Sequence, residues 1–267
     1  HFHSIYFYIH SMAKDFTLDI YGEMLKAAIA AGYHLTSFEA YLNKPGAHGK
    51  TFILRHDVDK LPDNSLRTAQ LQASLGAKGT YYFRVVKGSF HPRVIESIRD
   101  LGHEIGYHYE DMDICKGDTE KALLHFEKWL ARFREFYPVK TICMHGSPMS
   151  KWDNRLLWKE NDYKKYDIIA EPYYDLDFKK VFYLTDTGRK WDGEKVSIRD
   201  KVDSGFDLSF HHTQEIIDAF NQGRMPDTIM HNIHPQRWTN SPVLWTKELL
   251  LQNLKNQIKG QMVRMKR

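Results

Sequence analysis

Two aspartates at the end of an apolar segment have a spacing that suits metal-dependent chemistry. Asp57 and Asp59 come directly after the apolar run at 52–54, which predicts a buried strand. Side chains two residues apart on a strand point to the same face. Burying two carboxylates together is costly unless a cation neutralises them or one of them is protonated. A bound metal beside a general base is therefore the preferred interpretation, and the alternative is that Asp59 or Asp63 caps the next helix.

A second group of polar residues lies around the end of the predicted strand at 104–109. His108 and Glu110 share one face of that strand, so both could bind the same ion as Asp59. Zinc and other divalent ions accept nitrogen and oxygen ligands of this kind. The alternative for His108 is a hydrogen-bonded histidine of the core. For His103 that alternative is preferred, because His103 begins the strand.

The elements that must position these residues alternate between short apolar strands and amphipathic helices. Strands are predicted at 51–55, 79–86, 104–109, 140–145, 168–171, 181–184 and 228–233. Helices are predicted at 64–75, 92–101, 119–136, 213–221 and 243–262. This alternation indicates an α/β fold of right-handed βαβ units around a parallel sheet. A distorted (β/α) barrel of about seven strands is favoured over an open sheet, with its chemistry at the carboxyl ends of the strands.

Three blocks of the sequence resemble the polysaccharide deacetylase (NodB-homology) family. They are Arg-His-Asp-Val-Asp at 55–59, Thr-Tyr-Tyr-Phe at 80–83 and Gly-His-Glu-Ile-Gly-Tyr-His at 102–108. The third block is fairly specific, and the resemblance extends in scattered blocks over roughly 52–238. It implies a distorted (β/α) barrel that removes acetyl groups from N-acetylated sugars or from xylan.

The same resemblance assigns roles to the residues of the first two groups. It implies that Asp57 is the catalytic base, and that Asp59 and His108 are ligands of a divalent metal, with zinc the expected ion. In the family the two acids are adjacent, whereas Val58 separates them here, so the division of roles between the two acids stays open.

A further departure concerns the third metal ligand. The family has a second histidine four residues after the first, and this chain has Met112 there. A thioether is a poor zinc ligand, so another side chain must complete the site if a metal is bound. His145, at the end of the predicted strand at 140–145, is the first choice, and Glu110 is the second.

Two later segments resemble the remaining motifs of the family. Asp186, Arg189 and Trp191 are similar to a motif that orients the catalytic groups, although Asp-Thr-Gly at 186–188 is also a good turn. His234, just before Pro235, is similar to the strand-end histidine that acts as general acid. His231 is predicted to lie on the opposite face of the strand, and the pair His211-His212 is predicted to lie on the surface or in a loop.

Aromatic residues near these motifs could bind a sugar ring. The predicted substrate-binding residues are Trp152, Trp191, Trp238 and Tyr109. For Trp152 the alternative is a place just before a helix that begins near Asp153. The function expected from all these features is metal-dependent removal of acetyl groups from an N- or O-acetylated sugar or polysaccharide. The alternatives are a metal-free protein that only binds glycan, which Met112 favours, and a metal-dependent C–N hydrolase of a small molecule.

The composition indicates the class of protein and the kind of partner that can be expected. The chain has 267 residues, of which 42% are apolar and 27% charged, as expected for a globular α/β domain. Its net charge of +4 comes from interspersed acids and bases, so no nucleic-acid partner is expected.

Targeting and redox features complete the predictions from sequence. No apolar run is long enough for a secretion signal or a membrane span, and Cys115 and Cys143 form no Cys-x-x-Cys pair. A cytoplasmic location is therefore expected. Residues 1–11 precede Met12 and are expected to be an extension outside the fold, which leaves 12–267 as one barrel domain.

Overall fold

The computed structural model describes all residues except 1–13, 45, 47, 48, 192–201, 266 and 267. The expected extension at 1–11 therefore lies outside the described residues. Within the described residues, seven strands form one sheet, and every pairing between them is parallel. The strands are β1 (His34–Thr36), β2 (Thr51–Val58), β3 (Thr80–Phe83), β4 (Glu104–Tyr109), β5 (Ile142–Met144), β6 (Phe182–Thr185) and β7 (Thr228–Ile233).

The strands follow the order β5-β4-β3-β2-β7-β6, and β1 pairs with β2 outside this path. The six strands of the path curl into a half-barrel, so the predicted α/β class and parallel sheet are confirmed. The sheet is compatible with the predicted distorted barrel, but it is not fully closed. The predicted strand at 168–171 is reduced to a single bridge between Thr141 and Ala170. Its continuation is blocked because Glu171 caps a helix that starts at Pro172, so the described residues show no strand pairing between β5 and β6.

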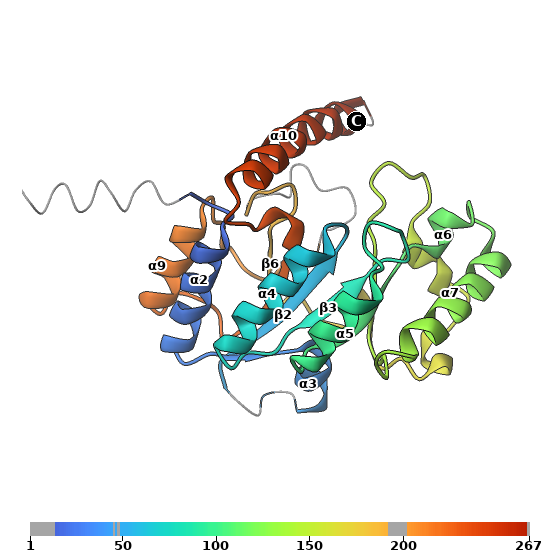
Figure 1. Cartoon of the computed structure of the whole chain (residues 1–267), viewed down its shortest axis with the longest axis horizontal. Helices are drawn as coiled ribbons and strands as arrows, with labels where there is room; N and C mark the ends of the chain where they lie inside the picture. The colour runs from blue at the N-terminus through green and yellow to red at the C-terminus, as the bar shows by residue number, and fades with distance from the viewer. Residues whose placement is uncertain (1–13, 45, 47–48, 192–201, 266–267) are drawn as a thin grey trace, which may run out of the picture.

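Helices cover the outside of the sheet (Figure 1). They are α2 (Leu18–Ala30), α3 (Phe38–Asn43), α4 (Pro62–Ser74), α5 (Pro92–Asp100), α6 (Asp111–Ile114), α7 (Thr119–Arg134), α8 (Pro172–Asp175), α9 (Thr213–Asn221) and α10 (Pro242–Met265). Short 3-10 helices occupy Asn154–Trp158, Tyr163–Tyr166 and Pro235–Arg237. The five predicted helices are all present, whereas α2, β1 and α3 were not predicted. Among the described residues, no helix combines the length and apolar character needed to cross a membrane.

Two glycines in the segment at 102–108 are required by the geometry around β4. Gly102 follows α5 with φ of +83°, a conformation that a side chain disfavours. Gly106 lies under the ring of Tyr82, and an added Cβ would come within 2.3 Å of that ring. The two glycines therefore allow β4 to pair closely with β3, which sets the position of His108 at its carboxyl end.

Candidate metal and catalytic site

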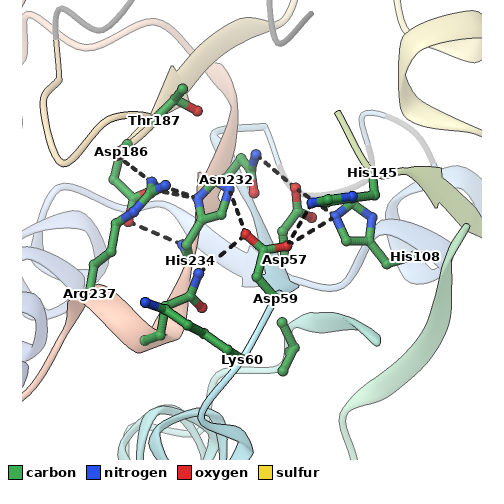
Figure 2. Close-up of polar contacts among 12 residues, drawn as sticks. Asp57, Asp59, Lys60, His108, His145, Asp186, Thr187, Asn232, His234 and Arg237 are labelled. Carbon is green, nitrogen blue, oxygen red and sulfur yellow. Dashed lines mark hydrogen bonds and ion pairs between the residues drawn. The ribbon is translucent and has the colours of Figure 1, made fainter. Parts of the chain in front are cut away.

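The carboxyl ends of four strands bring five of the predicted site residues into one pocket. Asp57 and Asp59 come from β2 and the residues after it, and His108 from β4. His145 follows β5, and His234 follows β7. All five line the same pocket, which has a volume of about 540 Å³. Figure 2 shows the two aspartates between His234 on one side and His108 and His145 on the other.

Asp57 is buried and held by a buried arginine. Arg55 Nε donates to Asp57 Oδ1 at 3.0 Å, and Arg55 Nη2 donates to Asp57 Oδ2 at 2.7 Å. Asn232 Nδ2 also donates to Oδ2, at 3.2 Å. Burial alone raises the pKa of this carboxyl, but the Arg55 guanidinium outweighs burial and holds the pKa below its usual range. Asp57 is therefore an ionised carboxylate that faces the pocket.

Asp59 has a buried oxygen that no hydrogen bond satisfies. Its Oδ1 lies 3.7 Å from His108 Nε2 and 3.5 Å from His145 Nε2. Its Oδ2 lies 3.9 Å from His234 Nε2 and accepts a hydrogen bond from Gln236 Nε2 at 3.3 Å. An orphaned buried carboxylate oxygen beside imidazole nitrogens is the arrangement that a cation would satisfy.

The capping alternative for these aspartates does not hold. The residue that caps α4 is Leu61, in a left-handed conformation with φ of 52°, and it makes no side-chain hydrogen bond to the helix. Asp59 precedes that position and points into the pocket. Asp63 lies in the first turn of α4 instead of capping it.

His108 and His145 both present Nε2 to the pocket because their other ring nitrogens have fixed partners. The backbone oxygen of Cys143 can only accept, so His108 Nδ1 donates to it at 2.9 Å. His145 Nδ1 lies 3.0 Å from the Glu110 carboxylate and donates to it in the same way. Each Nε2 therefore faces Asp59 Oδ1, and it is through such a nitrogen that a neutral histidine binds metal.

Glu110 lies behind His145 instead of in the pocket. Its two oxygens accept from Arg84 Nε at 2.9 Å and Arg84 Nη2 at 2.6 Å. Burial raises the pKa of Glu110, but its hydrogen bonds to His145 and Arg84 outweigh burial and lower the pKa to about 2. Of the two predicted third ligands, His145 therefore has the suitable position, and Glu110 orients it.

His234 is oriented by Asp186, as the resemblance implied. His234 Nδ1 donates to Asp186 Oδ1 at 2.6 Å, and the His234 backbone N–H donates to Oδ2 at 3.1 Å. Burial and Arg237 both lower the pKa of His234, but Asp186 outweighs them and the pKa lies above its usual value. This pair leaves His234 Nε2 facing the pocket, near Asp59 Oδ2.

Arg189 does not reach the site, and the prediction for this residue is corrected. Its guanidinium lies 4.4 Å from the centre of the Trp245 ring and packs against Phe16. The arginine that contacts Asp186 is Arg237, whose Nη1 donates to Asp186 Oδ1 at 2.7 Å. The turn at 186–189 gives Arg189 a positive φ of 58° and directs its side chain toward α10.

Trp238 and Trp191 are core residues instead of sugar-binding surfaces. Trp238 is fully buried, and its Nε1 donates to Asp186 Oδ2 at 2.7 Å. Trp191 donates to Thr213 Oγ1 at 3.0 Å and stacks on His231. Neither ring lines the pocket, because both pack between the sheet and the surrounding helices.

The other two predicted sugar-binding residues also lie outside the pocket. Tyr109 is fully buried, and its ring packs against Phe126 and Trp158. Trp152 packs directly over Gly117. The alternative for the Trp152 segment is confirmed, because the adjacent Asp153 side chain caps a 3-10 helix.

One group of described residues has its ligand atoms mutually close enough to hold a metal ion, and it is not the group around Asp59. Asp57, His108 and Cys143 each offer one ligand atom, and these atoms lie within 4.8 Å of one another. Arg55, however, occupies both oxygens of Asp57 and places a positive charge beside the group. The Oδ1 atom of Asp59, in contrast, accepts no hydrogen bond. Zinc bonds of about 2.0–2.2 Å put two tetrahedral ligand atoms roughly 3.3–3.5 Å apart, close to the 3.5 and 3.7 Å at Asp59 Oδ1.

The pocket contains residues that the sequence motifs did not indicate. Arg84 closes the Thr-Tyr-Tyr-Phe block, and Gln236 and Arg237 follow His234, so their neighbours in the sequence could have pointed to them. One whole wall of the pocket comes from α10, and no sequence motif predicted that this helix lies there. Its pocket-lining residues are Glu248, Gln252, Lys255 and Ile258.

Comparison with known proteins adds no relative to this description. No protein-family model matches the sequence, and no curated protein matches it.

Proposed function

We propose that this protein is a metal-dependent hydrolase that removes acetyl groups from an N- or O-acetylated sugar. The observation that carries the proposal is the unsatisfied buried oxygen of Asp59, with two histidine nitrogens at 3.5 and 3.7 Å. The resemblance to polysaccharide deacetylases supports the reaction class independently of this geometry.

Asp59, His108 and His145 are the residues that would hold the ion. They supply one carboxylate and two imidazole nitrogens, a donor set that suits zinc. When bound, such an ion polarises a carbonyl and lowers the pKa of water. Glu110 and the Cys143 carbonyl fix the two imidazoles, as partners of this kind do in metal sites.

Asp57 is the proposed general base. Arg55 keeps it ionised, so it can accept the proton of a water molecule that attacks the acetyl carbon. Its Oδ2 lies 3.8 Å from His108 Nε2, close enough to act on a water beside the ligand set. Arg55 already balances the negative charge of Asp57. For this reason Asp57, and not Asp59, is assigned as the base.

His234 is the proposed general acid. Asp186 holds its Nδ1 and leaves Nε2 facing the pocket, 3.9 Å from Asp59 Oδ2. A proton at Nε2 can then pass to the amine or hydroxyl that leaves as the tetrahedral intermediate collapses. Base and acid thus lie on opposite sides of Asp59 (Figure 2).

Elemental analysis of the purified protein, followed by an acetate-release assay with added Zn²⁺, tests the proposal. The substrates are N-acetylglucosamine, its oligomers and acetylated xylan oligomers. Asp57→Asn should retain the metal and lose about 10²–10⁴-fold in rate. Asp63→Asn, an exposed change outside the pocket, is the control. Metal-loaded protein that releases no acetate from any of these substrates would rule out deacetylation.

The metal-free alternative has weaker support. It depends on Met112, but Met112 is buried in the core and lies outside the pocket, while His145 provides the missing imidazole. Elemental analysis decides between the two hypotheses directly.

A further inference from the structure

The carboxyl-end face of the sheet is covered by α10. Figure 1 shows α10 along the top of the molecule, on the side toward which β2 points. Glu248, Gln252, Lys255 and Ile258 of this helix line the pocket together with the candidate catalytic groups. The helix therefore forms a wall of the site.

Specific contacts hold α10 in this position. Lys60, in the loop after β2, forms an ion pair of 2.8 Å with Glu248, which is itself buried. Arg189 Nη1 donates to the backbone oxygen of Trp245 at 3.1 Å, and Asn256 Nδ2 donates to the turn after β6 at 2.8 Å. Contacts at both the β2 and the β6 side of the site make the helix a fixed part of the pocket.

Residues outside α10 also line the pocket. They include Pro148 and Met149, in the loop after β5, and Tyr173, which lies near Arg55. The pocket volume of about 540 Å³ is in the range of pockets for small ligands. A long glycan chain needs an open groove on both sides of the reacting unit, and α10 occupies one of those sides.

Three of the four lysine and arginine side chains among the described residues that line the pocket are paired with a carboxylate, and the carboxylate of Asp59 keeps one unsatisfied oxygen. Lys60 is paired with Glu248, Arg84 with Glu110, and Arg237 with Asp186. Lys255 is exposed, lines the pocket, and forms no ion pair with another side chain in the part of the chain that the structure describes. An anionic group on the substrate would complete this arrangement.

We propose that the pocket takes a small acylated substrate, one or two sugar units in size, whose anionic group is bound by Lys255. This inference rests on the proposed function for the reaction, and on α10 and Lys255 for the substrate class. A phosphate or a carboxylate has the required charge.

Rates of acetate release test the size and charge of the substrate. The probes are N-acetylglucosamine 1-phosphate, neutral N-acetylglucosamine and the neutral N-acetylglucosamine hexamer. We expect the highest kcat/KM for the phosphorylated sugar and the lowest for the hexamer. A hexamer that is hydrolysed with the highest kcat/KM would overturn the inference, because the pocket would then be open to polymers.

Binding to metal-free protein, measured by calorimetry after dialysis against a chelator, tests Lys255 separately from catalysis. Lys255→Gln should weaken binding of the phosphorylated sugar about two- to fivefold, the range of an exposed charge pair. Lys247→Gln, an exposed change on α10 outside the pocket, is the matched control and should leave the Kd unchanged. The difference between wild type and Lys255→Gln should shrink at high salt.

The two measurements separate failure of the inference from failure of the proposed function. If no probe releases acetate but Lys255→Gln still weakens binding of the phosphorylated sugar, the proposed reaction is wrong and the substrate class holds. If the phosphorylated and neutral sugars bind equally, or Lys255→Gln behaves like Lys247→Gln, the substrate class is wrong.

Discussion

His145 Nε2 lies 3.5 Å from Asp59 Oδ1, although the two residues follow strands that are not neighbours in the sheet. β3 and β4 separate β2 from β5, and the curl of the sheet brings the two strand ends together. The contact supplies an imidazole that the local sequence lacks, since Met112 stands where the resembled family has its second histidine.

Loss of His145 should weaken metal binding. His145→Ala removes one proposed ligand, and Glu110→Ala removes the acceptor that orients it, which should lower zinc affinity about 10- to 100-fold. Cys143→Ser is the discriminating control and should leave affinity unchanged. A zinc titration with a competing chelator measures all three variants. If Cys143→Ser loses the metal and His145→Ala keeps it, the ion is held by the group of Asp57, His108 and Cys143.

Loss of His234 should affect turnover and not metal content. His234→Ala removes the proposed proton donor, so kcat should fall about 10²–10⁴-fold with little change in KM. His212→Ala, a change at an exposed histidine, is the control. Steady-state kinetics combined with elemental analysis gives both quantities. Loss of the metal in His234→Ala would make His234 a ligand and leave the acid unassigned.

Replacing Met112 should leave the metal in place. The side chain belongs to α6 and is buried in the core, and Met112→Leu conserves its volume, so stability should change by less than about 1.5 kcal/mol. Elemental analysis of the variant checks that the metal is retained, and urea unfolding checks the change in stability. A large loss of metal in a folded Met112→Leu protein would show that the thioether is a ligand.

Stability should fall as the pH is lowered, because the core contains neutral histidines. Burial lowers the pKa of His231 to about 3 and that of His103 to about 4, whereas an unfolded histidine titrates near 6.5. Between these values the unfolded chain binds more protons than the folded one. Each histidine therefore removes about 1.4 kcal/mol of unfolding free energy per pH unit as the pH falls from about 6.5 toward its folded pKa.

A variant of His231 measures how much this one residue contributes to the pH dependence of the unfolding free energy. Neither ring nitrogen of His231 has a hydrogen-bond partner, and the ring stacks on Phe52 and Trp191. His231→Phe should keep the stacking and flatten the dependence of the unfolding free energy on pH below about 6.5. Urea unfolding of both proteins in the presence of chelator provides the comparison. Equal slopes for the two proteins would show that His231 is not kept neutral by the fold.

Features that depend on neighbouring residues in the chain could be predicted from the sequence alone. The bounds of β4 and α9 agree with the predicted 104–109 and 213–221, because strand and helix periodicity are local properties. Asp57, Asp59 and His108 were recognisable because they lie where apolar strands end. Parallel strands place their carboxyl ends on one side of a sheet, so the strand ends also predicted that these residues lie close together.

The direction of individual side chains was decided only by the tertiary structure. Arg189 and Arg237 both lie near Asp186 in the fold, but packing directs Arg189 to Trp245 and leaves Arg237 on the carboxylate. Trp238 faces the core, although its sequence position next to His234 suggested the pocket.

The position of α10 at the pocket likewise could not be predicted from the sequence pattern of the helix. The amphipathic pattern of a helix indicates that one face will be covered, but not which part of the protein covers it. The ion pair of Lys60 with Glu248 joins segments that are distant in the sequence, and it forms only after the strands between them have assembled. The size and charge of the pocket follow from that assembly, because they depend on contacts between distant segments and not on the pattern within any one of them.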